Sequence, residues 1–297
     1  MEKLKAANLK KLLYWMEERQ RIYLHRRDGD PWPWTKDPIL QRYRFCNTYR
    51  EQDRETVWLR ENWLKPYADH INLWFAVCMF RQINWSPALA EIGFPKTWDP
   101  RRVLRVMEAR RARGEKLYTS AYMLPSGGDS SKAHYTVYTV LNPLWKAVES
   151  GATTPPWYDA NIDPVTLEAS HKWLNGFFGW GAFLAYEVVS DLRHTRYLCE
   201  ASDIYNWANP GPGAKRGIQR LLEKDLKYPI NRDQLLDYMR EAFRYVYARR
   251  NGEILPTLEM RDIEHSLCEM DKYLRVQERG ERSSGLEVFR PPQARLI

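Results

Sequence analysis

The sequence predicts a mainly α-helical protein, and three observations support this fold class. Apolar residues recur every three or four positions along most of the chain, as they do on one face of a helix. Stretches rich in proline and glycine separate these periodic segments. The 297 residues are 44% hydrophobic, which is enough to bury a core as one large domain or two lobes.

The expected helices follow one another along most of the chain. An amphipathic helix over residues 3–27 comes first, and a breaker-rich linker at 28–38 follows it. Later helices are expected at 39–62, within 66–85, and at 100–114, 168–198, 215–224, 231–250 and 259–279. Asp99 and Gly114 suit the two ends of the basic helix at 100–114, as an N-cap and a terminating glycine.

Residues 117–142 allow two interpretations. The segments "LYTSAYML" (117–124) and "YTVYTVL" (135–141) are rich in β-branched and aromatic residues. They flank "PSGGDSSK" (125–132), so a short β-hairpin is one prediction. Either segment is also compatible with a buried helix, because periodicity does not decide over such short runs.

The domain organisation expected from these elements has three parts. Residues 1–39 form an N-terminal helical extension and linker, and residues 40–280 form one helical catalytic domain. Residues 281–297 are polar and contain prolines, which predicts a loosely held C-terminal tail.

Composition narrows the class of partner. A net charge of +8 and a pI of about 9.2 favour an anionic partner, most simply nucleic acid, although plain solubility explains them equally well. The sequence contains no P-loop, GxSxG, HExxH or GxGxxG motif, which argues against the common nucleotide-dependent, hydrolase and metalloprotease classes.

The cysteines and the apolar runs indicate a soluble protein in a reducing cytosol. Cys46, Cys78, Cys199 and Cys268 are far apart and form no CxxC pair, so free thiols and no metal site are predicted. The N-terminus has no signal peptide. The longest apolar runs, at 71–80 and 177–186, are far shorter than the roughly 20 residues that span a bilayer.

The stretch "NPGPGAKRGIQRLL" is the first candidate site. Gly211 and Gly213 lie in a rigid turn that opens a helix, and Lys215 and Arg216 follow at once. Free N–H groups at a helix N-terminus bind phosphate, and adjacent cations would strengthen the binding. The alternative is an ordinary tight turn between helices with solvated cations.

The last helix carries the second candidate. At 100° per residue, Asp262, His265, Glu269 and Lys272 fall within about 80° of one another, and apolar residues occupy the opposite side. Asp271 points in a third direction, closer to the apolar side. The alternative is a solvated face laced with ion pairs.

Two smaller constellations complete the candidates. On the expected helix at 39–62, Asn47, Arg50 and Arg54 share a face, which suits bidentate phosphate binding or an exposed Arg–Glu face. Glu187 and Asp191 lie one turn apart near the end of a buried helix. Carboxylates in such a place need partners, and shifted acids belong to active sites.

Four segments in order resemble motifs of one bacteriophage family. They are "YRFCNTYREQDRETVWLRENW", "YADHINLWFAVCMFRQINW", "NPGPGAKRGIQRLL" and "DIEHSLCEMDKYLRV". The family is that of alpha-glutamyl/putrescinyl thymine pyrophosphorylases, also described as amino acid:DNA transferases, and a related helical domain occurs fused to or beside 5-hydroxymethyluracil (5-hmdU) DNA kinases. The resemblance covers about residues 42–277.

The resemblance implies a fold and a reaction. The fold is related to the helix-hairpin-helix DNA glycosylases. In the reaction, an amine, most simply the amino acid glycine, displaces pyrophosphate from the 5-methylene carbon of pyrophosphorylated 5-hydroxymethyluracil in DNA. The family often has Gln-Asn where this chain has Glu264-His265, and Phe where it has Met270, so the identity of the amine stays open.

The same resemblance suggests roles for the candidate residues. The general base would be Asp262, Glu269 or Asp271, with Lys272 beside it. Pyrophosphate would bind Asn47, Arg50 and Arg54, and DNA would bind the turn of Gly211, Gly213, Lys215 and Arg216. The base pocket would use Tyr49, Trp58 and Tyr273, and the amine site Glu187, Asp191 or His265.

The implied partners are double-stranded DNA containing pyrophosphorylated 5-hydroxymethyluracil, a free amino acid or other amine, and functional coupling to a 5-hmdU DNA kinase. No cofactor is expected, although Mg²⁺ could accompany the pyrophosphate. No membrane partner is expected, and the host cell cytoplasm would be the location of a phage-encoded enzyme. Two alternatives remain: a base-excision DNA glycosylase, and a non-catalytic DNA-binding partner of the kinase.

Overall fold

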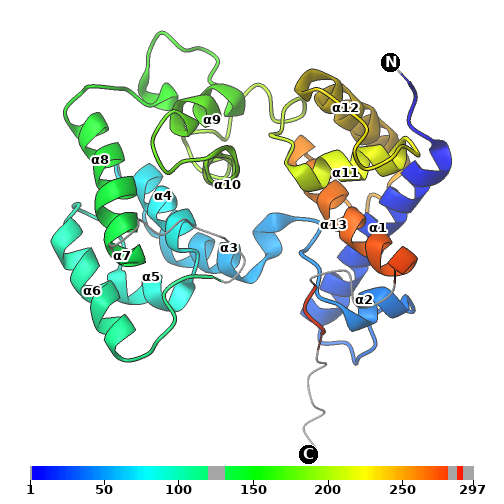
Figure 1. Cartoon of the computed structure of the whole chain (residues 1–297), viewed down its shortest axis with the longest axis horizontal. Helices are drawn as coiled ribbons and strands as arrows, with labels where there is room; N and C mark the ends of the chain where they lie inside the picture. Colours follow the sequence, from blue (N-terminus) through cyan, green and yellow to red (C-terminus); the bar gives the residue numbers. More distant parts are fainter. Residues whose placement is uncertain (1, 120–130, 280–285, 290–297) are drawn as a thin grey trace, which may run out of the picture. The chain divides into compact units, whose positions relative to one another are not determined.

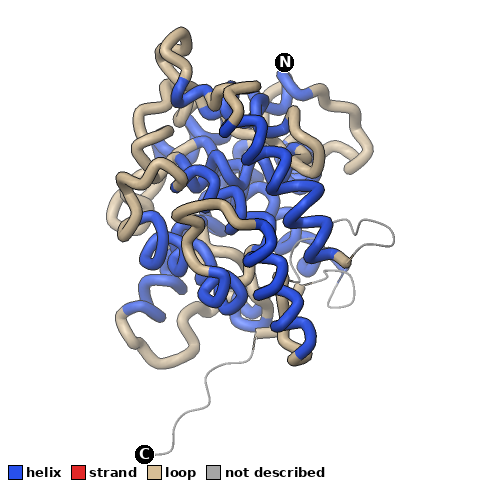
Figure 2. The backbone as a smooth tube through the Cα atoms, turned by 90° about the vertical axis from the view of Figure 1, so that its left-hand side faces the viewer, coloured by secondary structure: helices blue, strands red, loops and turns tan. Residues whose placement is uncertain are grey.

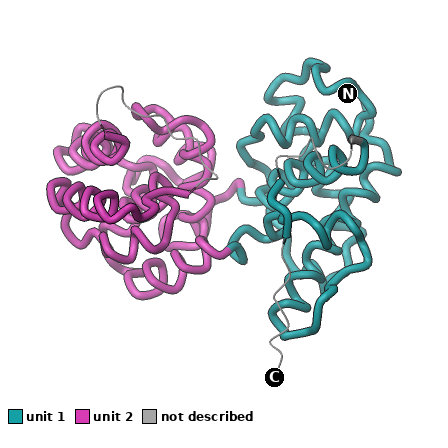
Figure 3. The backbone as a smooth tube through the Cα atoms, turned by 60° about the horizontal axis from the view of Figure 1, so that its bottom comes forward, with its two compact units in different colours: residues 1–53, 204–297 teal, residues 54–203 magenta. Residues whose placement is uncertain are grey.

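The chain forms two compact units. The computed structural model describes residues 2–119, 131–279 and 286–289, so the predicted 125–132 loop lies almost wholly outside the described residues. Unit 1 combines residues 1–53 with 204–297, and unit 2 comprises residues 54–203 (Figure 3). Helices supply nearly all the regular structure of the described residues (Figure 2), which confirms the mainly α prediction. The relation to helix-hairpin-helix glycosylases stays a prediction.

Unit 1 is built around the last helix of the chain. The described helices of this unit are α1 (Ala6–Arg27), α2 (Pro38–Arg42), the short 3₁₀ helix η1 (Arg50–Gln52), α11 (Pro212–Leu221), α12 (Arg232–Arg249) and α13 (Met260–Arg279) (Figure 1). Helix α13 packs against α1, α11 and α12. Its apolar side, with Ile263 and Leu267, is fully buried, as the helical periodicity predicts.

Helix α1 belongs to this core. Leu12, Trp15 and Met16 have no exposed surface, because the helix packs against α11, α12 and α13. The division into units therefore differs from the expected one, in which residues 1–39 were an extension outside the main domain. The apolar face of α1 is buried against helices more than 180 residues away in sequence.

Part of the expected C-terminal tail is held in place. The N–H of Arg44 donates to the Glu287 carbonyl at 2.9 Å, and the N–H of Phe289 donates to the Arg42 carbonyl at 2.7 Å. Tyr43 and Val288 form an antiparallel bridge between these bonds. These backbone pairs fix residues 286–289 on unit 1, whereas the rest of the tail lies outside the described residues.

The single helix expected at 39–62 is wrong. Asp37 caps α2, accepting from the N–H groups of Ile39 and Leu40, but the helix ends at Arg42. Residues 42–44 then pair with residues 287–289, and the chain runs without helix from Tyr43 to Tyr49. Asn47, Arg50 and Arg54 therefore do not share a helical face.

Unit 2 is a second all-helical unit. Its described helices are α3 (Arg54–Leu59), the π-helical turn η2 (Arg60–Leu64), α4 (Leu73–Ile83), α5 (Ser86–Ile92), α6 (Pro100–Ala112), α7 (Lys132–His134), the π-helical stretch η3 (Tyr135–Leu141), α8 (Asn142–Glu149), the 3₁₀ turn η4 (Pro156–Tyr158), α9 (Leu167–Asn175) and α10 (Ala182–Leu192) (Figure 1). Every residue of α4 is buried, so α4 is the central helix. The Asp99 carboxylate caps α6 as expected, accepting from the Arg102 N–H at 2.9 Å.

The predicted β-hairpin is contradicted where it is described. Residues 135–141, the second expected strand, continue the helix begun by α7. Thr136, Val137, Val140 and Leu141 are buried, and their spacing matches one side of a helix rather than alternate faces of a strand. Burial in unit 2 thus overrides the β propensity of these side chains.

The long helix expected at 168–198 is also wrong, since it is broken into α9 and α10. Gly179 lies between them with a φ of +80°, a left-handed conformation that favours glycine. A Cβ atom at this position would come within 2.5 Å of Val140. At this break the backbone of Gly179 therefore lies against the Val140 side chain of η3.

Candidate active site

The glycine turn at the start of α11 lies against α13. A Cβ atom on Gly213 would stand 2.2 Å from the Cys268 Sγ, and one on Gly217 would stand 2.6 Å from the Leu267 carbonyl oxygen. Only glycine permits so close an approach of two helices. Gly213 and Gly217 therefore serve the packing of α11 on α13.

The N–H of Gly211 is already engaged. It donates to Glu264 Oε1 at 3.1 Å, so a protein carboxylate occupies part of the turn that was expected to hold phosphate. Gly211 and Gly213 thus have structural roles. The binding of DNA by this turn with Lys215 and Arg216 stays a prediction.

Asp271 is the centre of a buried ion cluster. Its carboxylate has no exposed surface and accepts from Arg216 Nε at 2.8 Å and Arg220 Nε at 2.7 Å. Arg275 Nε approaches at 3.4 Å. The ion pairs with Arg216 and Arg220 join α11 to α13 through Asp271, which is a structural role. The assignment of Asp271 as a candidate base stays a prediction.

The polar side of α13 is buried rather than solvated. Glu269 is 2% exposed; its Oε2 accepts from the Cys46 N–H at 3.2 Å, and its Oε1 pairs with Lys272. The extended segment 43–49 thus covers this side of the helix. We call the cluster formed by residues 46–53 with His265, Glu269 and Lys272 the α13 polar cluster.

Asn47 organises the cluster from the extended segment. Its Oδ1 accepts from Arg19 Nη2 at 2.7 Å, so α1 also contributes. Its backbone N–H and its Nδ2 both donate to Asp53 Oδ1, at 3.0 and 2.9 Å. Arg50 Nε lies 3.5 Å from Asp53 Oδ2. The fold therefore brings Asn47 and Arg50 to α13, without the helical face that the sequence suggested.

Burial shifts the charges of the cluster. Desolvation, reinforced by Arg50 and Lys272, holds the pKa of His265 well below its usual value. The imidazole is therefore neutral at physiological pH. Burial alone would lower the pKa of Lys272, but the Glu269 carboxylate outweighs it and raises that pKa. The site combines a neutral imidazole with the ion pair of Lys272 and Glu269.

Asp262 lies one turn from the cluster, at the start of α13. Its Oδ2 accepts from the Glu259 N–H at 2.8 Å, as the third residue of a helix does in a capping box. Burial raises the pKa of this carboxyl to about 8, with Glu51 adding to the shift and Arg261 opposing it. Asp262 is thus both a cap and a carboxyl with a pKa near neutrality.

Of the three residues expected in a base pocket, Tyr49 and Tyr273 lie in unit 1 and Trp58 lies in unit 2. Tyr49 is buried near Asp262, whose charge adds to the effect of burial in raising the pKa of the phenol. Tyr273 donates to Asp37 Oδ2 at 2.7 Å, which ties α13 to the cap of α2. Trp58 belongs to unit 2, where it stacks on Phe80.

Arg54 is the first residue of unit 2, whereas Asn47 and Arg50 belong to unit 1. Its side chain is 78% exposed and pairs with Glu55. Its role as a phosphate ligand beside Asn47 and Arg50 stays a prediction.

Glu187 and Asp191 hold the core of unit 2 together. Arg81 of α4 donates to Asp191 through Nε at 2.5 Å and Nη2 at 2.6 Å, and its Nη1 lies 3.0 Å from Glu187. All three side chains are buried. This ion cluster is the partner that the two carboxylates required. The assignment of Glu187, Asp191 or His265 to an amine site stays a prediction.

Sequence reasoning missed Cys46, Asp53 and Arg19. All three contribute to the α13 polar cluster or its support. The quoted motif "YRFCNTYREQDR" contains Cys46 and Asp53, but a lone cysteine or aspartate carries no spacing signal. Arg19 lies on the buried side of α1, and an arginine there could have indicated a buried partner.

Comparisons with known proteins agree with the helical fold. The family model for the helical domain of 5-hmdU DNA kinases matches residues 6–282. A 5-hmdU DNA kinase of Bacillus phage SP10 is 27% identical over 290 residues, and the alignment covers 86% of this chain. It covers 43% of that kinase, so the chain spans less than half the length of this relative.

Two further findings concern solved structures and membrane-spanning helices. No solved structure matches the chain. Among the described residues, no helix is both long enough and apolar enough to cross a membrane.

Proposed function

We infer the function from one premise: this chain belongs to the family of 5-hmdU DNA kinase helical domains. We propose that it hypermodifies thymidine positions in phage DNA, in the cytoplasm of the infected host. It transfers an amino acid, glycine first among them, or another amine to pyrophosphorylated 5-hydroxymethyluracil. The four family-like motifs support the transfer. The kinase relative is named for the same modified base, 5-hydroxymethyluracil, which also supports it.

The α13 polar cluster is the observation that carries this proposal. The reaction breaks the bond between the 5-methylene carbon and oxygen, and pyrophosphate leaves with the electron pair. The amine lone pair forms the new C–N bond, and one ammonium proton passes to a base. Lys272 and Arg50 are the cations that stabilise the leaving charge, a contribution that is often the largest in an active site.

Two carboxylates are suited to accept the proton. Glu269 is held against Lys272, and Asp262 has a pKa raised to about 8 by burial. A base is most effective when its pKa lies near the working pH, and this favours Asp262. The position of Glu269 within the α13 polar cluster favours Glu269. Asp271 is omitted because three arginines enclose it.

Binding of the duplex is assigned to the exterior of unit 1. Lys215 of α11 supplies charge, while Arg216 is shared with Asp271. The glycosylase-like fold implied by the motifs fits extrusion of the modified base, which costs a few kcal/mol.

A second candidate follows from the comparison with the kinase. The matched family is a domain of a kinase, and the alignment covers less than half of the phage SP10 kinase. A chain with this domain could bind the modified DNA for a separate kinase without performing chemistry.

The test is mass spectrometry of nucleosides from pyrophosphorylated 5-hydroxymethyluracil DNA incubated with the chain and mixed amino acids. A nucleoside heavier than thymidine by an amine substituent, with release of pyrophosphate, supports transfer. Unchanged nucleosides with retained DNA binding indicate the non-catalytic partner, and loss of the base indicates a glycosylase.

The variants Glu269→Gln and Asp262→Asn separate the two bases. Loss of the true base should slow transfer about 10²–10⁴-fold and leave DNA binding intact. Glu253→Gln removes an exposed carboxylate of unit 1 and is the matched control. Normal transfer by both Glu269→Gln and Asp262→Asn would reject this site.

A further inference from the structure

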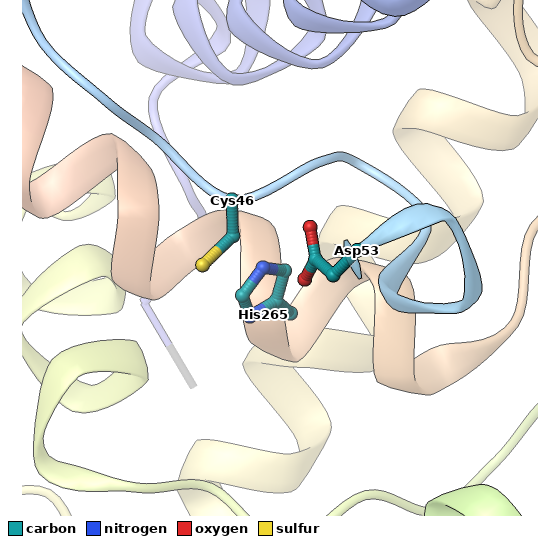
Figure 4. A group of neighbouring side chains, drawn as sticks. All are labelled: Cys46, Asp53 and His265. Carbon is teal, nitrogen blue, oxygen red and sulfur yellow. The ribbon is translucent and has the colours of Figure 1, made fainter. Parts of the chain in front are cut away.

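Three potential metal ligands converge within the α13 polar cluster. The Cys46 Sγ, a carboxylate oxygen of Asp53 and a ring nitrogen of His265 all lie within 4.8 Å of one another. Figure 4 shows the imidazole between the thiol and the carboxylate, all from unit 1. Sulfur, nitrogen and oxygen ligands of these types bind zinc-like divalent cations.

His265 is held with one nitrogen unused. Its Nε2 is buried and has no hydrogen-bond partner among the described residues. A buried ring nitrogen without a partner, close to a thiol and a carboxylate, is a position that a bound metal ion would satisfy.

Asp53 is oriented by Asn47. Asn47 donates twice to Asp53 Oδ1, which leaves Oδ2 facing the looser contact with Arg50 at 3.5 Å. Ligating carboxylates are commonly held by such outer hydrogen bonds.

We propose that Cys46, Asp53 and His265 form a binding site for a divalent cation of the zinc class. Three protein ligands leave a fourth position for water or for a small anionic ligand. Ligand bonds of about 2.0–2.3 Å require the three atoms to draw closer than the 4.8 Å limit. No metal site is expected from the sequence, so this proposal departs from that expectation.

The charges around the site are compatible with binding. Cys46 loses its thiol proton to solvent as the metal–sulfur bond forms, so one proton is released for each ion bound. Arg50 and Lys272 act electrostatically on His265 and Cys46. Lys272 is already paired with Glu269, and the cation replaces Arg50 beside Asp53.

Titration of the full chain with Co²⁺ tests the proposal, because a cobalt–thiolate bond gives a charge-transfer absorption band. The expected result is a band that saturates at one ion per chain and is displaced by Zn²⁺. Cys46→Ser should abolish the band, and Asp53→Asn and His265→Gln should weaken Co²⁺ binding at least 10-fold. The matched control is Cys268→Ser. Cys268 lies on α13, as His265 does, but is not one of the three ligands, so this variant should retain the band.

Three results would overturn the proposal. They are absence of a saturable band in the unsubstituted chain, persistence of the band in Cys46→Ser, and its loss in Cys268→Ser alone. Circular dichroism of each variant without metal shows whether that variant folds. If Cys46→Ser does not fold, the presence or absence of a saturable band in the unsubstituted chain still tests the proposal. The readout does not depend on amine transfer, so this proposal and the proposed function can fail separately.

Discussion

At the scale of single residues, Asp271 differs from the other carboxylates of α13 because three arginines surround it. Asp271→Asn leaves Arg216, Arg220 and Arg275 around a neutral amide. Breaking a buried ion pair costs about 3–5 kcal/mol, so we expect a loss of that order in the free energy of unfolding, measured by urea denaturation.

The control for this prediction is Asp237→Asn. Asp237 pairs with Arg240 on the surface and is 51% exposed, so its loss should cost less than about 1 kcal/mol. Equal stability of Asp271→Asn and the unsubstituted chain would return Asp271 to the list of candidate bases.

Asp262 should make stability depend on pH. Its pKa rises from 3.8 in the unfolded chain to about 8 in the fold, so the folded state holds the proton more tightly. Its contribution to stability is complete below pH 4 and is lost as the pH rises toward 8, by up to about 1.4 kcal/mol per pH unit.

The comparison with Asp262→Asn isolates this effect. The amide still accepts from the Glu259 N–H, so the cap survives. His265 acts in the opposite direction, since its lowered pKa favours folding as the pH rises through 6.5; it is present in both proteins and cancels in the difference. Unfolding between pH 5.5 and 8 should show a steeper fall for the unsubstituted chain. Parallel curves would contradict the pKa assigned to Asp262.

At the scale of elements, the contact between α11 and α13 depends on the absence of side chains. Gly217→Ala places a methyl group 2.6 Å from the Leu267 carbonyl oxygen, and the backbone there cannot move without displacing α13. Overpacking of this kind costs about 1–3 kcal/mol, so we expect a lower midpoint in thermal unfolding. Gly252→Ala is the control, because no atom lies within 4 Å of its added methyl group. Similar midpoints for both variants would disprove the close approach.

The helices that sequence predicts best are those with strong periodicity and clear ends. Helix α6 begins after its Asp99 cap, and α13 buries the apolar side that the 100° spacing assigns to it. The end of the helix at Arg42 was missed because residues 42–44 pair with residues 287–289 instead of continuing it. Such a distant partner leaves no local signal.

The candidate site was predictable only in part. The spacing of His265, Glu269 and Lys272 places them on one side of a helix, and this holds. Sequence could not show that residues 46–53 cover that side, because the cover is irregular backbone rather than a periodic element. The sequence also could not show that Arg81 forms ion pairs with Glu187 and Asp191, since these pairs join α4 to α10.

At the scale of the whole molecule, the net charge of +8 predicts that DNA binding weakens steeply with salt. Each phosphate contact contributes roughly −0.9 to the slope of log K against log[salt]. Lys215→Ala removes one cation of α11 without disturbing Asp271, whose partners are Arg216, Arg220 and Arg275. We therefore expect a slope smaller in magnitude by about 1, measured by fluorescence anisotropy with a duplex at several salt concentrations.

A lysine elsewhere on unit 1 separates local contact from overall charge. Lys10→Ala removes an exposed cation from α1 and lowers the net charge by the same amount. If DNA contacts the start of α11, Lys215→Ala reduces the slope and Lys10→Ala changes it little, because counterion release counts phosphates in contact rather than total charge. Equal effects of the two variants would mean that the protein attracts DNA through its overall net charge. The turn at Gly211 would then serve only the packing of α11 on α13.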